Sequence, residues 1–372
     1  MTIYPPTSLK EMQERGWDEA DVILFTGDAY VDHPSFGAAV IARSLDSMDV
    51  RVAVVPQPNW QDDLRDFRKL GRPRLFFGVA AGAMDSMLNH YTAFRKRRHN
   101  DAYTPGGRSG ARPDYPTIEY TRILKRLFPD VPVVLGGIEA SLRRLTHYDY
   151  WQNRLRQSIL VDSGADMLVY GMGEAPMQEI VRLLGRGVPF QSINTVPQTS
   201  FLVEGPDNVP KNKRWRTLEL HSHRECLGDK KIFAENFVTI ETNSNNMDQA
   251  RLVQATDGGI VVVNPAMPQM DSSDLDRIYD LPFTRKPHPR YRKKEPIPAY
   301  EMIRDSVTIH RGCFGGCSFC TISAHQGKFV TSRSRESVLR EIRQIAGDSD
   351  FKGHITDLGG PSAHMYGMKG RE

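Results

Sequence analysis

The chain has 372 residues, of which 39% are hydrophobic and 25% are charged, and its formal net charge is +4. This length suits two or three globular domains, and the composition excludes a wholly disordered chain, a collagen-like repeat and a coiled coil. So small a net charge does not by itself indicate nucleic-acid binding.

The sequence contains no run of about 18 apolar residues, the length that crosses a bilayer, and its first residues lack the apolar core of a secretory signal. Three of the four cysteines lie within eight residues of one another. Secreted proteins usually spread their cysteines along the chain for disulfides. We therefore expect a cytoplasmic protein with no membrane partner, and a metal or redox centre at the clustered thiols.

Short apolar runs alternate with amphipathic stretches over the first half of the chain. The runs expected to be strands are 21–25, 50–55, 74–79, 131–135 and 166–170. The segment 36–48 carries apolar residues at helical spacing. This alternation predicts an α/β fold whose first domain, residues 1–190, is a doubly wound, Rossmann-like parallel sheet with helices on both faces.

Ligands of such sheets bind beyond the carboxyl ends of the strands. The loops expected there are 26–30, 136–139 and 171–174, and each contains glycine, which more often serves a tight turn than a ligand. No phosphate-binding glycine motif follows a strand, so a nucleotide site is not indicated. Asp32 and His33 follow the first loop, and we expect His33 to satisfy its own loop.

A polar run over residues 139–151 follows the fourth predicted strand. A helix here would place Arg143 and His147 on one face, four residues apart. This face suits either a substrate between the domains or packing against the second domain.

The middle of the chain carries weaker patterns. Residues 100–116 are rich in Gly, Pro and Arg and are expected to form a long exposed loop. The basic runs 95–98 and 290–294 are typical of solvated faces, which makes nucleic acid an unlikely partner, and salt-dependent binding would test that hypothesis. Residues 191–298 are expected to be a connecting region, with a strand at 259–263 and a helix at 272–279. It ends in a proline-rich basic linker from residue 284.

The third segment, residues 299–372, carries the candidate chemistry. A strand over 305–310 leads into Cys313, Cys317 and Cys320, spaced C-x3-C-x2-C. Three thiolates on one tight loop bind three irons of a cubane cluster and leave the fourth iron open. The alternative is a structural zinc site with His325 or Cys226 as a fourth ligand, although zinc sites usually present two C-x2-C pairs.

The C-x3-C-x-aromatic-C loop after a strand resembles the signature of radical S-adenosylmethionine enzymes. Further segments are similar to YgiQ-type radical S-adenosylmethionine proteins over nearly the whole chain, namely 26–43, 135–151, 281–291, 299–320, 325–328 and 332–337. The resemblance implies that the N-terminal sheet is related to cobalamin-binding domains. It also implies that residues 299–372 start a partial TIM-type radical domain, while the substrate stays unassigned.

This resemblance implies specific cofactors and partners. The three cysteines would hold a [4Fe–4S] cluster that reductively cleaves S-adenosylmethionine to a 5′-deoxyadenosyl radical, with reduced flavodoxin or ferredoxin as electron donor. Phe319 matches an aromatic position near the adenine. Gly359 and Gly360, after a strand-like run at 352–358, match the glycine pair that contacts the cofactor's methionyl amine. The fold leaves cobalamin open, and no residue requires it.

Two features depart from the family pattern. The chain ends at Glu372, where family members continue for hundreds of residues, so we expect an incomplete radical domain. His364 stands where the family pattern has an asparagine after the glycine pair. The rival to a radical enzyme is therefore a non-catalytic metal-binding or interaction protein, either zinc-based or a truncated relic that keeps the cluster without the reaction.

Overall fold

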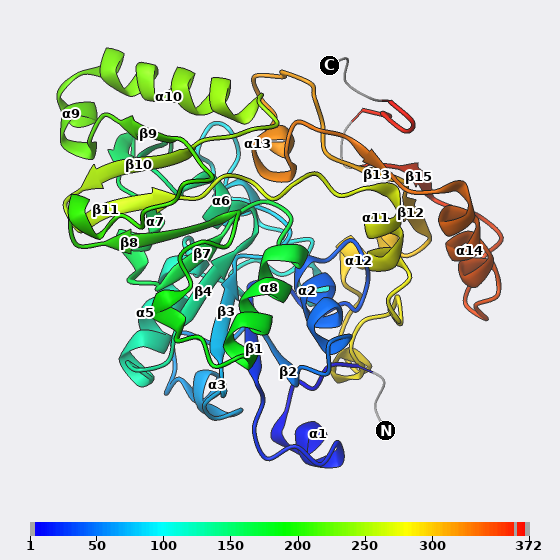
Figure 1. Cartoon of the computed structure of the whole chain (residues 1–372). Helices are drawn as coiled ribbons and strands as arrows, with labels where there is room; N and C mark the ends of the chain where they lie inside the picture. Colours follow the sequence, from blue (N-terminus) through cyan, green and yellow to red (C-terminus); the bar gives the residue numbers. More distant parts are fainter. Residues whose placement is uncertain (1–3, 361–362, 369–372) are drawn as a thin grey trace.

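The computed structural model describes residues 4–360 and 363–368. Its centre is a nine-stranded sheet with the order β2-β1-β3-β4-β7-β8-β11-β10-β9 (Figure 1). The strands of this sheet are β1 (Val22–Thr26), β2 (Val52–Pro56), β3 (Phe76–Ala80), β4 (Val133–Gly136), β7 (Met167–Val169), β8 (Thr199–Val203), β9 (Thr217–Leu220), β10 (Arg251–Thr256) and β11 (Gly259–Val263). The first five are parallel to one another, β8 and β11 run antiparallel to their neighbours, and β9 pairs with β10 in parallel.

Helices cover both faces of this sheet, as the alternation of apolar runs predicts. They are α1 (Leu9–Glu14), α2 (Gly37–Asp46), α3 (Arg65–Arg68), α4 (Ser86–His90), α5 (Pro116–Leu127), α6 (Gly137–Leu142), α7 (Ile159–Ser163), α8 (Glu174–Gly185), α9 (His223–Gly228), α10 (Lys230–Ser244) and α11 (Ser272–Tyr279). Successive strand residues point to opposite cores: Ile23 packs on the α5 side, and Val22 packs on the side of α2 and α8. The predicted fold class is confirmed.

All five predicted strands form, with their ends shifted by one or two residues. The strand expected at 259–263 is β11, and the helix expected at 272–279 is α11. The sheet also continues through β8 to β11, which lie in the region expected only to connect two domains. One sheet therefore crosses the predicted boundary at residue 190. The boundaries at residues 190 and 298 stay a prediction.

The C-terminal segment starts a second, smaller layer (Figure 1). Its elements are α12 (Pro298–Ile303), β12 (Ser306–Thr308), β13 (His310–Arg311), α13 (Ile322–Gln326), β14 (Thr331–Ser332), α14 (Arg335–Ala346) and β15 (Asp357–Gly359). Strands β12 and β15 pair in parallel, and α14 packs on them through a core that includes Val307, Ile309, Val338 and Ile345. This strand–helix–strand arrangement is the expected first unit of a partial barrel.

The remaining regular elements are the short antiparallel pair β5 (His147–Asp149) and β6 (Arg154–Arg156), and four single 3₁₀ turns. Within the residues that the structure describes, none of the helices has both the length and the apolar character needed to cross a membrane.

Candidate functional site

The cysteine loop begins at β13 and folds back against the segment that follows α13. The Gly312 N–H donates to Oε1 of Gln326 at 3.1 Å, and the Cys313 N–H donates to the Gly327 carbonyl at 3.1 Å. Gly312 has a φ of +84°, and a β-carbon there would lie 2.0 Å from the Phe329 carbonyl oxygen. Because only glycine tolerates both conditions, this position fixes the start of the loop.

Two of the predicted thiols meet at a second glycine. A β-carbon on Gly315 would lie 3.3 Å from Sγ of Cys313 and 3.9 Å from Sγ of Cys317. The Gly315 N–H points at the Cys313 sulfur, at 3.4 Å. The Cys320 N–H donates to the Cys317 carbonyl at 3.0 Å, which makes a tight turn between the last two cysteines. Cys313 is buried, Cys320 is partly buried and Cys317 is exposed.

The chemistry of this donor set fits an iron–sulfur cluster. Thiolates are the ligands that such clusters take, and a backbone N–H aimed at sulfur is a contact that tunes them. In the described ranges, no three Cys, His, Asp or Glu side chains are arranged to hold a metal ion. The loop therefore gathers two sulfurs at Gly315, and Cys320 does not complete a three-ligand group with them.

The glycine pair lies beside the strand that leads to the cysteines. The Ile309 N–H donates to the Gly359 carbonyl at 2.7 Å. A β-carbon on Gly360 would come within 2.3 Å of the His310 ring, which is completely buried. Glycine at 360 is thus required by a neighbouring side chain. His364 lies near the same ring, with the ring centroids 6.3 Å apart.

Phe319 is 88% exposed at the outer side of the cysteine loop. A large aromatic side chain left so open costs favourable burial and is available to contact a flat ligand. Its assignment to the adenine stays a prediction.

A buried ion pair joins the cysteine loop to the large sheet. Arg311, directly before Gly312, pairs with Glu174, the first residue of α8 after the loop at the carboxyl end of β7. The Arg311 Nε also donates to the Tyr279 hydroxyl at 3.1 Å. Burial opposes the charged guanidinium, but the Glu174 carboxylate outweighs burial and raises the pKa of Arg311. The loop 171–174 is predicted at this edge for its glycines, whereas the sequence gives no signal for the role of Glu174.

A second anchor runs from α13 to α6. Nδ1 of His325 lies 3.0 Å from Oγ of Ser141. The Ser141 hydroxyl donates to the Gly137 carbonyl and accepts from the Gly171 N–H. Because the Ser141 hydroxyl donates its only proton to Gly137, it accepts in the contact with His325, and the protonated Nδ1 of His325 is the donor. Burial lowers the pKa of His325 to about 4, which keeps the imidazole neutral.

Neither candidate for a fourth zinc ligand contacts Cys313, Cys317 or Cys320 in the part of the chain described here. His325 is engaged by Ser141. Cys226 is buried on α9, where its sulfur accepts from Nδ2 of Asn236 at 3.2 Å, and burial raises the pKa of its thiol. These contacts are those of a structural thiol on the outer part of the sheet.

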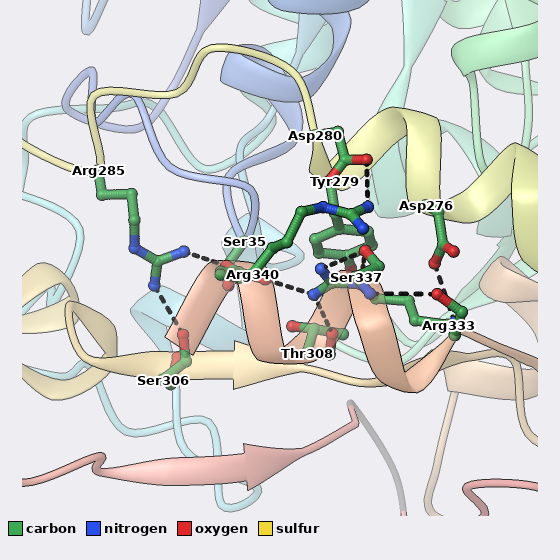
Figure 2. A network of polar contacts seen from close by, with 12 residues as sticks. Ser35, Asp276, Tyr279, Asp280, Arg285, Ser306, Thr308, Arg333, Ser337 and Arg340 are labelled. Atoms are coloured by element: carbon green, nitrogen blue, oxygen red, sulfur yellow. Dashed lines mark hydrogen bonds and ion pairs between the residues drawn. The ribbon is translucent and has the colours of Figure 1, made fainter. Parts of the chain in front are cut away.

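A network of arginines ties the basic linker to the barrel start (Figure 2). Arg285 donates to the Ser306 carbonyl at 2.7 Å, and Arg333 donates to the Thr308 carbonyl at 2.9 Å. Both guanidiniums pair with the same buried carboxylate, Glu341 of α14. Arg333 also lies over the ring of Tyr279, at 4.2 Å. The linker is therefore fastened to the first barrel strand by buried charge.

The switch point of the sheet, between the carboxyl ends of β1 and β3, is filled by the chain itself. A β-carbon on Gly27 would lie 2.2 Å from the Ala81 carbonyl oxygen, so the two loops touch. Arg112, 1% exposed, donates to that carbonyl at 2.8 Å and pairs with Asp28 at 2.8 Å and Asp101 at 3.1 Å. The loop expected to be exposed over 100–116 thus sends one arginine into the crevice where such sheets bind ligands.

The helix expected across residues 143–147 is wrong. Helix α6 ends at Leu142, because the Arg143 carbonyl accepts from the Ile159 N–H and so leaves the helical pattern. The Arg143 side chain pairs with Asp85 at 2.8 Å, whereas His147 lies on β5. The two side chains do not share a helix face.

The interpretation of the first loop is confirmed. Nδ1 of His33 accepts from the Ser35 N–H at 3.1 Å, so the imidazole satisfies its own loop. Burial lowers its pKa well below the ordinary range. Asp32 accepts from Nε of Arg43 at 3.0 Å and from the Thr284 N–H at 2.9 Å.

Comparison with known sequences gives a clear family match. The family described as Radical SAM N-terminal matches residues 4–306. A UPF0313 protein of Porphyromonas gingivalis is 62% identical over 372 residues, which are 100% of this chain and 58% of that protein. A UPF0313 protein of Geobacter sulfurreducens is 49% identical over 98% of this chain and 59% of its own length. The chain therefore spans somewhat less than three fifths of these relatives.

Comparison with solved structures shows a related fold. The radical S-adenosylmethionine methyltransferase TsrM from Kitasatospora setae, with tryptophan substrate and a SAM analog bound, aligns with a TM-score of 0.50 and 18% identity. The alignment covers 92% of this chain and 48% of that chain. At this identity the likeness concerns the arrangement of the sheet and the barrel start.

Proposed function

The chain belongs to the Radical SAM N-terminal family and to the YgiQ-type radical S-adenosylmethionine proteins, and from this premise we propose that it binds a [4Fe–4S] cluster and S-adenosylmethionine. Cys313, Cys317 and Cys320 would hold three irons. Gly359 and Gly360 would lie beside the methionyl group and Phe319 beside the adenine. When bound, the cluster supplies the electron that cleaves S-adenosylmethionine to a 5′-deoxyadenosyl radical.

One observation carries this proposal. The sulfurs of Cys313 and Cys317 both approach Gly315, on the loop that follows β12 and β13. Strand β12 pairs with β15, which ends at the glycine pair. In the proposed complex, the cluster ligands and the cofactor contacts would thus come from segments that follow two paired strands. Holding three irons would require Cys320 to join the other two thiols.

The remaining residues hold this loop against the sheet. Arg311 and Glu174 anchor its start through a buried ion pair, and Gln326 accepts from its first N–H. His325 on Ser141 fixes the following helix. Restricting the loop in this way lowers the conformational entropy lost when a ligand binds.

Three finer points belong to the same proposal. A reduced flavodoxin or ferredoxin would supply the electron. A reducing cytoplasm suits three free thiols. Cobalamin is left out, because Arg112 with Asp28 and Asp101 already fills the switch point of the sheet.

Anaerobic reconstitution with iron and sulfide tests the proposal. We expect about four irons and four sulfides per chain and an electron paramagnetic resonance signal that shifts when S-adenosylmethionine is added. Replacing Cys313, Cys317 and Cys320 together by alanine should abolish iron and sulfide binding, and Cys226→Ala should leave both unchanged. Zinc without sulfide would contradict the proposal. A cluster that never yields 5′-deoxyadenosine with a strong reductant would leave cofactor binding intact and refute the cleavage step.

A further inference from the structure

A short hairpin after α4 presents a run of cations, and we call residues 91–98 the basic hairpin. Its backbone is ordered: Tyr91 and Arg97 form a bridge, the Arg98 N–H donates to the His90 carbonyl at 2.7 Å, and the Thr92 N–H donates to the Lys96 carbonyl at 2.9 Å. The run is therefore displayed on a defined turn.

The charges of the basic hairpin are not neutralised by the protein. Arg95, Lys96, Arg97 and Arg98 are all exposed, and no carboxylate of the described chain lies within ion-pair distance of any of them. Other basic side chains near the carboxyl edge do have acidic partners; Arg112, for example, has two. Four adjacent unpaired cations repel one another, and an anionic partner would relieve this repulsion.

Aromatic rings lie among these cations. Phe94, at the tip, is 88% exposed. The Arg95 guanidinium lies over the ring of Tyr150 at 4.7 Å, and the Tyr150 hydroxyl donates to the Ala93 carbonyl at 2.7 Å. Tyr150 and nearby Tyr148 are 43% and 49% exposed. Arg95 also has a φ of +59°, a conformation that a residue other than glycine adopts only when its surroundings impose it.

The position of this surface relates it to the cysteine loop. The basic hairpin follows β3, and Tyr148 and Tyr150 follow β4, so both lie beyond the carboxyl ends of parallel strands. The cysteine segment is anchored at the same edge, through Ser141 after β4 and Glu174 after β7.

We propose that the basic hairpin, with Tyr148 and Tyr150, binds single-stranded nucleic acid. Unpaired arginine and lysine side chains contact phosphates, while exposed aromatic faces stack on bases that a single strand leaves open. In a duplex the faces of the bases are covered by neighbouring base pairs. A lipid surface offers no aromatic ring that could stack on Phe94. This binding does not depend on the proposed cofactor chemistry. Only the idea that the bound strand is also the substrate would rest on the proposed function.

Binding is measured on the whole chain without cofactors, by fluorescence anisotropy of labelled single-stranded RNA and DNA of about 15 nucleotides. We expect affinity to fall steeply as salt is raised, because cations are released from the strand. A triple variant, Arg95→Gln with Lys96→Gln and Arg97→Gln, should weaken binding at least about tenfold. It should also reduce the slope of the log of the binding constant against the log of the salt concentration by up to about two. Arg98 stays, because its Nε holds the hairpin through the Leu88 and Tyr91 carbonyls.

The matched control removes the same number of charges from another exposed basic run, by Arg292→Gln, Lys293→Gln and Lys294→Gln. Both triple variants lose the same net charge. The control should change affinity little, because its three residues lie outside the basic hairpin. Phe94→Ala removes no charge and should weaken binding about 5- to 100-fold, the effect of losing one stacked base.

Several results would overturn the proposal. They are equal losses in the two triple variants, full affinity in Phe94→Ala, and preference for heparin or for vesicles of anionic lipid over both oligonucleotides. A difference between RNA and DNA identifies which strand the surface prefers. Because no cofactor is present, failure here leaves S-adenosylmethionine cleavage untouched, and failure of cleavage leaves this result standing.

Discussion

Gly360 lies so close to the buried His310 ring that a β-carbon there would come within 2.3 Å of the imidazole. This contact joins the end of β15 to the strand that enters the cysteine loop. It gives the second glycine of the pair a structural reason that does not depend on a bound cofactor.

Gly360→Ala should therefore destabilise the chain by about 1–3 kcal/mol, because the added methyl group would push against the buried His310 ring. Chemical denaturation measures this loss. Gly359→Ala is the matched control, since the atoms nearest to its β-carbon would belong to the exposed carboxylate of Asp357, at 3.2 Å, which can rotate away. Equal losses in the two variants would show that the His310 contact is not the cause.

Glu174→Gln should cost about 3 kcal/mol of unfolding free energy, because it leaves the buried Arg311 charge without its carboxylate. Hydrogen exchange should rise over residues 311–320 in the same variant. Glu179→Gln removes a partly exposed carboxylate from the same helix, paired with Arg182, and should cost less than about 0.5 kcal/mol. Unchanged exchange in the loop of Glu174→Gln would contradict the anchoring role.

The stability of the chain should depend on the protonation of His325. Its pKa is about 4 in the folded chain, below the ordinary 6.5, because burial disfavours the imidazolium. The unfolded chain thus binds the proton first, and stability falls as the pH drops from about 6.5 to about 4. The loss reaches up to about 3 kcal/mol at 1.36 kcal/mol per pKa unit. Denaturation curves at several pH values should show a shallower slope in His325→Gln, and parallel slopes would refute the assignment.

Hydroxocobalamin should not bind the wild-type chain, because Arg112 occupies the switch point. Absorbance titration and hydrogen exchange over residues 100–112 check this. Tight binding that loosens this loop would show that the crevice opens.

Arg112→Ala should destabilise the chain at neutral pH by leaving Asp28 and Asp101 as unpaired buried carboxylates. Burial already raises the pKa of Asp28, so the folded variant takes up protons more readily than the unfolded one as the pH falls. The penalty should shrink on acidification toward pH about 5. Denaturation of wild type and variant at both pH values measures it, and a constant penalty would argue against a buried charge effect.

The sequence predicts the strands well because a buried strand is encoded by a short run of apolar residues. Each predicted run is a short block of apolar residues, and β11 is buried over its last three residues, as its valines suggest. The cysteine spacing likewise identifies the candidate loop, because all three thiols and their glycines lie within one short segment.

The anchors of that loop could not be predicted in the same way. Arg311 and Glu174 are 137 residues apart, and His325 and Ser141 are 184 residues apart. No pattern in the sequence indicates which charged residues, far apart along the chain, come into contact. Arg112 was placed in an exposed loop for the same reason, since glycine and proline around it indicate irregular backbone but not where one guanidinium points.

The carboxylate of Glu341 is shared by Arg285 of the linker and Arg333 of the barrel start. A recombinant fragment beginning at residue 299 would lose one of these two cations and expose the carbonyls of Ser306 and Arg304 that Arg285 covers. Such a fragment should express poorly. The cysteine-bearing segment and the sheet are thus to be cloned, purified and crystallised as a single unit.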